Sequence, residues 1–196
     1  KIIRNSHQVS ANTRLEINNT FGKVHINTWN KPQIDVEITI IVTGKKEEQL
    51  SAMLERIEVD MDAEREEIEY HTRIDNMNNK NGNSFEINYL ITMPENNPLE
   101  VKNSFGDFYL ADFKGSVELN LSYGALKIGR LSGNAEIKLS FNKGENVIDH
   151  IQRGDVKVGY SDLEIRSADN LELRNEFSTM YMDEVGILEA KVSYGN

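Results

Sequence analysis

The chain has 196 residues, with three prolines, thirteen glycines and no cysteine, which excludes a disulfide framework, a thiolate nucleophile and a cysteine-ligated zinc site. Its formal net charge of −10 at pH 7 argues against binding to nucleic acid or to an anionic membrane surface. The sequence has no run of eighteen apolar residues, so we expect no membrane insertion by this chain. Because it starts at Lys1, we expect a processed or trimmed chain, from which any targeting segment has been removed.

Residues 1–29 are predicted to form a first strand and a first coil. The phrase LEINNTFG, residues 15–22, alternates apolar and polar side chains, which is typical of a strand with one buried side. Gly22 then marks a corner, and a second short strand follows. The unit ends at Trp29, whose side chain we expect to be buried.

Residues 30–98 do not repeat this phrase, and we interpret them as an inserted antiparallel segment that caps the stack. The expected elements are a strand over 34–42, a helix over about 45–57, two strands around a turn at 63–66, a polar loop over 75–84 and a strand over 85–93 that ends at Pro94. A cap would cover the apolar interior and the unpaired backbone at the end of the repeats.

Residues 99–196 repeat the phrase, and their last coil is incomplete, so we expect further coils in a longer sequence. Counting the copy in the first coil, seven copies start at Leu15, Leu99, Val117, Ala135, Gly154, Leu171 and Leu188. Their aromatic residues are Phe21, Phe105, Tyr123, Phe141, Tyr160, Phe177 and Tyr194. From Phe105 onward the steps between the aromatic residues are 18, 18, 19, 17 and 17, and so regular a period indicates a repeat architecture.

This period predicts an all-β fold, a single-chain parallel β-helix or β-solenoid with coils of 17–20 residues. A unit of this length cannot enclose a core alone, whereas stacked units can bury a continuous one. Equivalent residues would lie about 4.8 Å apart, and we expect the aromatic residues to stack inside the tube. An ordinary β-sandwich is the alternative, but it does not explain a regular aromatic spacing. We favour a right-handed coil because the coil length varies.

The outward positions predict two rows of opposite charge. One row holds Glu16, Glu100, Glu118, Glu136, Asp155, Glu172 and Glu189, and the row beside it is mostly Lys and Arg. We interpret them as a solvated ladder that fixes the register; a cation site on the acidic row is the alternative. Three inward positions carry Asn19, Asn103 and Asn175, and we expect these amides to bond the backbone of the following bend.

The run ITMPENNPLEVKNSFGDFYLADFKGSVELNLSYGALKIGRLSGN, which ends at Asn134, resembles the bacterial "putative adhesin" proteins of β-strand repeats that are common in Bacteroidetes. The resemblance extends over nearly the whole chain. It implies a single-chain parallel β-helix that is usually exported. The family has no established catalytic residues, so the resemblance implies none here.

The sequence contains little that indicates chemistry. His7, His25, His71 and His150 lack ligand-like spacing, and we expect surface or turn positions for them. No hydrolase, metalloprotease, phosphate-binding or dinucleotide motif occurs. The carboxylates of residues 58–69 are interpreted as an edge-protecting face, with weak divalent cation binding as the alternative. We therefore predict no catalytic residue, no cofactor and no metal site.

The remaining candidate is a strip of outward side chains, Tyr109, Lys127 and Tyr181, suited to stacking on and hydrogen bonding a sugar or a peptide. We predict a non-enzymatic, exported β-helix whose side face binds a protein or glycan at the cell surface or scaffolds the envelope. The expected location is extracytoplasmic: periplasm, cell surface or medium. A carbohydrate-active enzyme of the polysaccharide lyase or hydrolase type is the alternative. The expected state is a monomer or a weak end-to-end oligomer.

Overall fold

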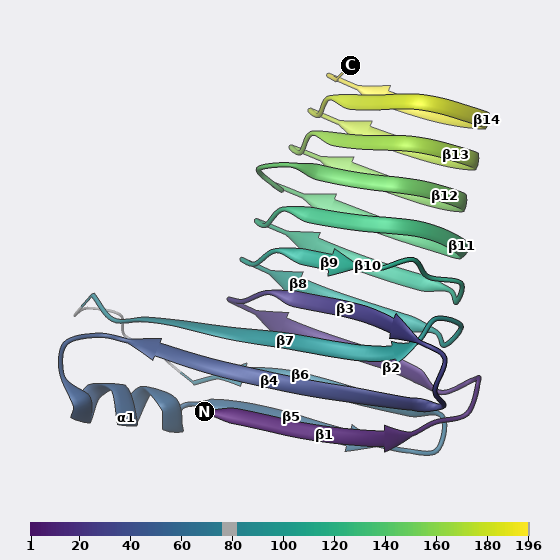
Figure 1. The fold of residues 1–196 in the computed structure, drawn as a ribbon. Helices are drawn as coiled ribbons and strands as arrows, with labels where there is room; N and C mark the ends of the chain where they lie inside the picture. The colour runs from purple at the N-terminus through teal and green to yellow at the C-terminus, as the bar shows by residue number, and fades with distance from the viewer. Residues whose placement is uncertain (76–81, 196) are drawn as a thin grey trace.

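The computed structural model describes residues 1–75 and 82–195 and shows a regular stack of coils on a curled N-terminal sheet (Figure 1). Almost all of its elements are strands, and the repeated coils pair in parallel. The predicted fold class, a single-chain parallel β-solenoid with a short helix in its non-repeating part, is confirmed. The predicted polar loop over 75–84 lies mostly outside the described residues.

The elements follow one another along the chain as β1 (Ile2–Gln8), β2 (Arg14–Thr20), β3 (Val24–Trp29), β4 (Gln33–Thr43), α1 (Glu47–Glu55), β5 (Ile57–Ala63), β6 (Glu67–Ile74), β7 (Ser84–Pro94), β8 (Leu99–Ser104), β9 (Phe108–Leu110), β10 (Val117–Ser122), β11 (Leu126–Ser140), β12 (Asn146–Gly159), β13 (Leu163–Glu176) and β14 (Met180–Ser193). The strands β11 to β14 are long because each bends from one side of the stack to the other.

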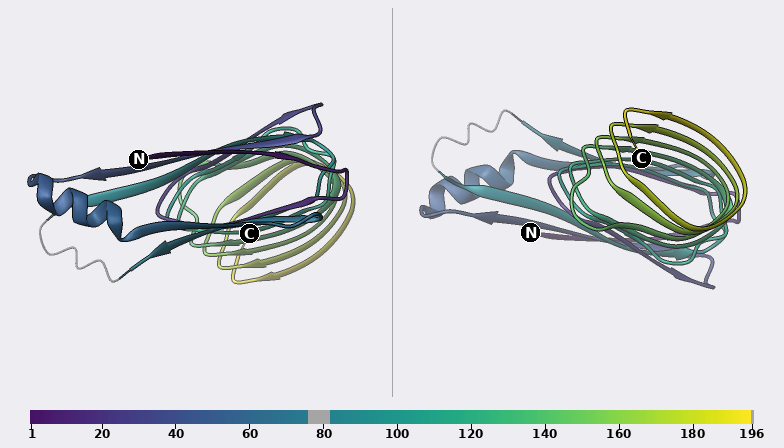
Figure 2. Two further views of the ribbon diagram at one scale, coloured as in Figure 1. Left: turned by 90° about the horizontal axis from the view of Figure 1, so that it is seen from below. Right: turned by 90° about the horizontal axis from the view of Figure 1, so that it is seen from above.

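Two walls form the sides of the stack. Wall A contains β5, β6, β2, β8, β10 and the second halves of β11 to β14, which are residues 135–140, 154–159, 171–176 and 188–193. Wall B contains β1, β4, β7, β3, β9 and the first halves of the same four strands, residues 126–131, 146–151, 163–168 and 180–185. Seen along the stack, successive coils lie over one another as flattened loops (Figure 2).

The strand registers align the seven copies of the repeated phrase. Leu15 pairs with Leu99, Leu99 with Val117, and Val117 with Ala135. The same position continues through Gly154, Leu171 and Leu188. The first two copies, 84 residues apart in the chain, are therefore neighbouring coils.

The inserted segment extends both walls below the first coil. β6 pairs in parallel with β2, and β7 pairs in parallel with β3. Antiparallel strands then complete each wall: β5 beside β6 in wall A, and β4 followed by β1 in wall B. Since β5 is an edge strand, its carboxylates Glu58, Asp60 and Asp62 lie where charge discourages pairing with another chain.

The interior is filled by rows of aliphatic side chains that run up the stack. One row of wall A consists of Ile17, Val101, Leu119, Ile137, Val156 and Leu173, each at most 2 % exposed. Full burial of one such side chain contributes about 1.5–3 kcal/mol. The coils are therefore held together by these rows of side chains as well as by the backbone hydrogen bonds between neighbouring strands.

The aromatic residues stack as predicted, but they do so outside the tube. The rings from Phe105 to Tyr194 lie parallel, with centroids 4.6–5.4 Å apart, and Phe21 stacks on Phe105 at 5.0 Å. The first six rings are 40–53 % exposed and Tyr194 is 85 % exposed. The expectation of a buried aromatic column is therefore wrong, and we call this outer stack the aromatic ladder.

Backbone conformation explains the outward rings. Alternation along a strand such as residues 117–123 places Tyr123 on the inner side, but its φ is 59°, and all seven ladder residues have φ of 51–61°. A residue with left-handed backbone conformation at the corner breaks the alternation, and its side chain therefore points to the outside. This conformation costs about 1–3 kcal/mol in a residue other than glycine. Each ring pair offsets part of that cost, since it contributes about 0.5–1.5 kcal/mol.

The inward asparagines bond the corner backbone, as predicted. Asn19 Nδ2 donates to the Gly22 carbonyl oxygen at 3.4 Å, and Asn103 Nδ2 donates to that of Gly106 at 3.0 Å. Asn175 Nδ2 does the same to Ser178 at 3.0 Å. The amides thus satisfy carbonyl groups that the turn would otherwise leave buried and unpaired.

Trp29 is half-buried, so the expectation of a buried side chain is wrong. Its Nε1 donates to the Gln33 carbonyl oxygen at 2.7 Å, and Lys31 Nζ lies 4.6 Å from the ring centroid. The chain leaves the first coil directly after Trp29 to enter β4. The ring therefore packs over that turn, with one face under a cation.

Candidate functional site

The outer side of wall A carries the two predicted rows of opposite charge. The acidic row consists of Glu69, Glu16, Glu100, Glu118, Glu136, Asp155, Glu172 and Glu189 on neighbouring strands. Lys102 Nζ lies 2.6 Å from Glu100 and 3.6 Å from Glu16, and Lys157 Nζ lies 3.4 Å from both Glu136 and Asp155. As the ladder interpretation predicts, basic side chains neutralise carboxylates that would otherwise repel one another.

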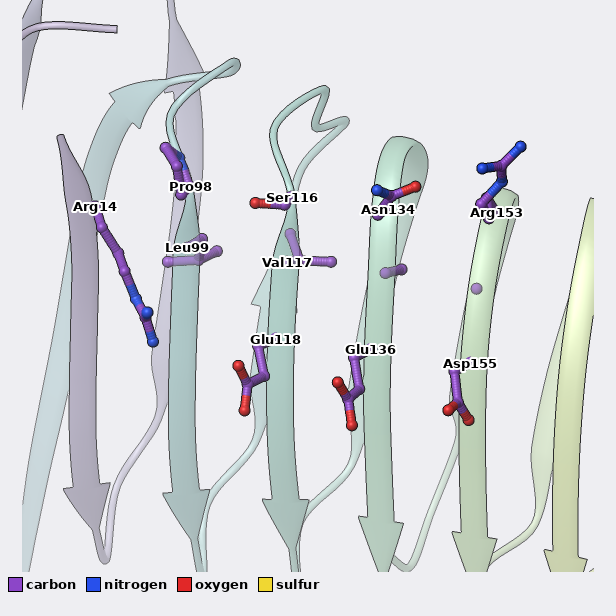
Figure 3. Close-up of a pocket in the computed structure, with 12 residues that line it drawn as sticks. Arg14, Pro98, Leu99, Ser116, Val117, Glu118, Asn134, Glu136, Arg153 and Asp155 are labelled. Carbon is purple, nitrogen blue, oxygen red and sulfur yellow. The ribbon is translucent and has the colours of Figure 1, made fainter. Parts of the chain in front are cut away.

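A shallow groove of about 410 Å³ crosses wall A where its strands begin. Figure 3 shows Glu118, Glu136 and Asp155 side by side along it, with Arg14 reaching in from β2 and Arg153 extending from β12. Arg14 forms an ion pair with Glu100, the most buried carboxylate of the row. Part of the charge in this groove is therefore already neutralised by ion pairing within the wall.

Three carboxylates on wall A are close enough to share a cation. The side-chain oxygens of Glu16, Glu67 and Glu69 lie within 4.8 Å of one another. However, Lys102 Nζ is 3.6 Å from Glu16, and Arg14 Nε is 3.9 Å from Glu67. These cations already neutralise part of the negative charge, which makes the cluster unattractive to a hard divalent ion.

A second groove, of about 330 Å³, lies on the outer side of wall B beside the aromatic ladder. Its outward side chains come from four successive coils: Lys23, His25, Asp107, Tyr109, Lys127 and Glu145. The rings of His25 and Tyr109 stack with centroids 4.2 Å apart, and Tyr109 pairs in register with Lys127. We call the trio His25, Tyr109 and Lys127 the wall B cluster.

The structure separates the third residue of the predicted strip from the other two. Reading up wall B, Lys127 pairs with Val147, Val147 with Glu164 and Glu164 with Tyr181. Three strand spacings, about 14 Å, therefore lie between Lys127 and Tyr181. The strip predicted from the sequence is thus a close pair, Tyr109 and Lys127, with Tyr181 exposed on the last strand.

His25 is not part of the strip predicted from the sequence, although a signal for it is present in the repeat. His25 occupies the same position of the repeat as Tyr109, and the two residues pair in register between β3 and β9. Once the first and second coils are known to be neighbours, this repeat position alone places His25 against Tyr109.

The other histidines serve the framework. His7 Nε2 lies 2.7 Å from the Tyr70 hydroxyl, and His71 Nε2 lies 3.2 Å from Asn18 Nδ2. His150 Nδ1 lies 2.9 Å from Ser167 Oγ. His150 is only 9 % exposed and sits within β12, so the expectation of a surface or turn position is wrong for this residue. Its ring is accommodated because the side chain of a neighbouring strand supplies a hydrogen-bond partner.

Two buried tyrosines bridge the base of the stack. Burial raises the pKa of the Tyr70 hydroxyl to about 12 and also raises the pKa of Tyr89. The Tyr89 hydroxyl lies 2.8 Å from Thr72 Oγ1, which donates to Asn19 Oδ1 at 3.0 Å. These hydroxyls are neutral at physiological pH; that of Tyr70 contacts His7 of β1, and that of Tyr89 is linked through Thr72 to Asn19 of the first coil.

These features define a β-solenoid with open grooves on its outer walls. No protein-family model matches the chain, and no curated protein matches its sequence. In the described part of the chain, no helix has the length and apolar character needed to cross a membrane.

Several solved structures match this chain, and their names agree with the family that the sequence resembles. A "putative adhesin" from Bacteroides fragilis NCTC 9343 is 15 % identical with a TM-score of 0.44, covering 100 % of this chain and 95 % of that one. One from Parabacteroides distasonis ATCC 8503 is 9 % identical with a TM-score of 0.39, covering 100 % and 94 %. A "putative cell adhesion protein" from Clostridium sporogenes ATCC 15579 is 14 % identical with a TM-score of 0.36, covering 98 % and 99 %.

The resemblance to such adhesins is thus confirmed, and these names indicate no enzymatic family. At these identities and scores the likeness carries no argument about function. The fold assignment rests on the strand registers of this chain, and a functional conclusion must rest on its surface.

Proposed function

We propose that this chain is a non-enzymatic binding module that acts outside the cytoplasm and holds a glycan against the outer side of wall B. The observation that carries the proposal is the wall B cluster, in which Tyr109, Lys127 and the unpredicted His25 share one open groove. An open groove suits an extended ligand that is bound without being enclosed.

The chemistry of the groove favours a glycan over a protein surface. Its outward side chains are polar or charged, with Asp107 and Glu145 near the cations Lys23 and Lys127. Such a set exchanges hydrogen bonds with hydroxyl groups, whereas the centre of a protein interface is usually depleted of charge. Because His25 covers one face of Tyr109, the ring would contribute mainly its edge and hydroxyl group.

We expect the double variant Tyr109→Ala/Lys127→Ala to bind its glycan about tenfold more weakly or worse, since two polar contacts are lost. The measurement is binding of the purified chain to a glycan array, followed by titration of the best ligand with parent and variant. Lys138→Ala is the matched control, because Lys138 lies on the same strand β11 but on wall A. The control should bind like the parent.

Three results would contradict the proposal. The array could show no binding, the double variant could bind as well as the parent, or the chain could bind only proteins. Cleavage of a bond in any member of a polysaccharide panel would favour the alternative, a carbohydrate-active enzyme. Mass analysis of the array ligand before and after incubation separates binding from turnover.

A further inference from the structure

The aromatic ladder occupies backbone positions at which glycine would be less strained. All seven residues have positive φ, a conformation that glycine adopts freely and that a bulky side chain adopts only at a cost. The first six rings are nevertheless 40–53 % exposed, so they are not needed to fill the core. Strained residues that the core does not need are candidates for function, and a contiguous exposed apolar surface marks an interaction site.

The part of the ladder that a ligand can reach is a row of ring edges. From Phe105 to Phe177 the interplanar angles are only 4–7°, so each ring covers the face of the next one. An aromatic edge carries partial positive charge and an aromatic face partial negative charge. The exposed edges therefore attract the electron-rich face of a flat aromatic molecule, whereas a cation would need an open ring face.

A row of small outward residues runs along the wall A side of the ladder. Its members directly precede the ladder residues and lie in register on neighbouring strands; we call Thr20, Ser104, Ser122, Ser140 and Gly159 the small row. Ser104 Oγ and Ser122 Oγ lie 2.9 Å apart. The small row therefore offers hydroxyl groups to an anion and places no long side chain beside the rings.

The next outward row of wall A is basic. Two residues before the small row, or about 7 Å along the strand, lie Lys102, Lys138, Lys157 and Arg174, which we call the basic row. Lys138 is exposed and forms no ion pair with another residue in the described part of the chain. The other three pair with carboxylates of the acidic row, which lies on the side away from the ladder. Positive charge is therefore the nearest full charge to the rings on this wall.

We propose that the ladder, the small row and the basic row together bind a flat, elongated aromatic anion that lies along the stack. Its rings would lie on the ladder edges, and its acidic groups would meet the hydroxyl groups of the small row and the cations of the basic row. Four strand spacings, about 19 Å, separate Lys102 from Arg174. A rigid ligand of that length contacts several coils at once, each of which offers a ring edge beside a small residue.

This surface shares no residue with the wall B cluster, so the proposal does not depend on glycan binding. Congo red is the probe, because it is a rigid, flat aromatic molecule with two sulfonate groups. We expect saturable binding to residues 1–196 in isothermal titration calorimetry, at dye concentrations below its self-association. Thioflavin T, a flat aromatic cation, should bind at least about tenfold more weakly.

The double variant Tyr123→Gly/Phe141→Gly tests the rings. Glycine adopts the φ of 59° and 58° at these positions without strain, so the chain should keep its fold by circular dichroism. We expect the dissociation constant of Congo red to rise about tenfold or more, because two neighbouring ring edges are lost. Tyr123→Phe is the matched control: it keeps the ring and should bind like the parent.

The variant Lys138→Gln tests the charge, and it should raise the dissociation constant about threefold or more. Lys114→Gln is the control, because it removes the same charge in the turn between β9 and β10, at the corner opposite the ladder. It should bind like the parent.

Four results would overturn the proposal. Congo red could fail to bind, or the double glycine variant could bind it as tightly as the parent. Lys114→Gln could weaken binding as much as Lys138→Gln, which would reduce the effect to net charge. Thioflavin T could bind as tightly as Congo red, which would remove the preference for an anion.

Discussion

Gly106→Ala is expected to destabilise the solenoid by about 3 kcal/mol. A Cβ atom at residue 106 would lie 1.8 Å from the carbonyl oxygen of Gly22 in the neighbouring coil and 2.4 Å from its carbonyl carbon. Both atoms belong to the backbone, so the clash can be relieved only by moving the coils apart. That movement would weaken the backbone hydrogen bond between these coils in which Phe21 N donates to the Ser104 oxygen at 2.9 Å.

Urea denaturation followed by circular dichroism measures this effect. Gly159→Ala is the matched control, because a Cβ at residue 159 would meet the Leu139 oxygen at an ordinary 3.9 Å. The control should change the free energy of unfolding by no more than about 0.5 kcal/mol. Equal stability of the two variants would show that the coils are not packed backbone to backbone at this corner.

Asn103→Leu is the second change with a large expected effect, a loss of about 3 kcal/mol. Asn103 Nδ2 donates to the carbonyl oxygens of Gly22 at 3.2 Å and Gly106 at 3.0 Å, and Asn103 Oδ1 accepts from Asn19 Nδ2 at 3.1 Å. Leucine would fill the space, as Leu121 does at the same position one coil further. It would nevertheless leave these buried polar groups with fewer partners, and each such group costs about 1–3 kcal/mol.

Asn120→Leu provides the comparison for this variant. It makes the same chemical change on the exposed outer side of β10, so its unfolding midpoint in urea should stay close to that of the parent. If Asn103→Leu were as stable as Asn120→Leu, the inward asparagines would be simple space fillers. Hydrogen exchange at the amides of residues 99–106 would locate any loss of stability in the affected coil.

The walls could be predicted from the sequence because each coil repeats the same local pattern. Alternation fixed which side chains of 117–121 face inward, and the period fixed which residue of the next coil lies beside each one. The ion pairs of Lys102 and Lys157 follow from those two facts. Such periodic features depend only on local geometry and on the stacking of identical units.

The position of the aromatic ladder could not be predicted by the same reasoning. Alternation assumes extended backbone up to the end of the strand, whereas Tyr123 and its equivalents adopt a left-handed conformation that is uncommon outside glycine. The sequence pattern predicts that the glycine after the ring makes the turn. In the structure, Gly106 has no positive φ, and the absence of its side chain serves the close approach of two backbones.

The candidate site was partly predictable for a similar reason. Tyr109 and Lys127 lie one regular coil apart, so their pairing follows from the period. Tyr181 lies beyond the coil that carries the longer turn at residues 142–146, and Val147 and Glu164 occupy the intervening positions. Equivalent positions can be identified from the sequence, but only the strand order shows how many strands lie between them.

Cross-linking of two introduced cysteines tests the central claim, that residues one coil apart in the sequence lie side by side on an outer wall. The chain has no cysteine of its own. In the variant Tyr109→Cys/Lys127→Cys, the Cα atoms are about 4.8 Å apart, within the range that a disulfide spans. We predict an intrachain disulfide under mild oxidation for this pair. We predict none for Tyr109→Cys/Tyr181→Cys, four strand spacings or about 19 Å apart. A disulfide in the second variant, or none in the first, would contradict the account.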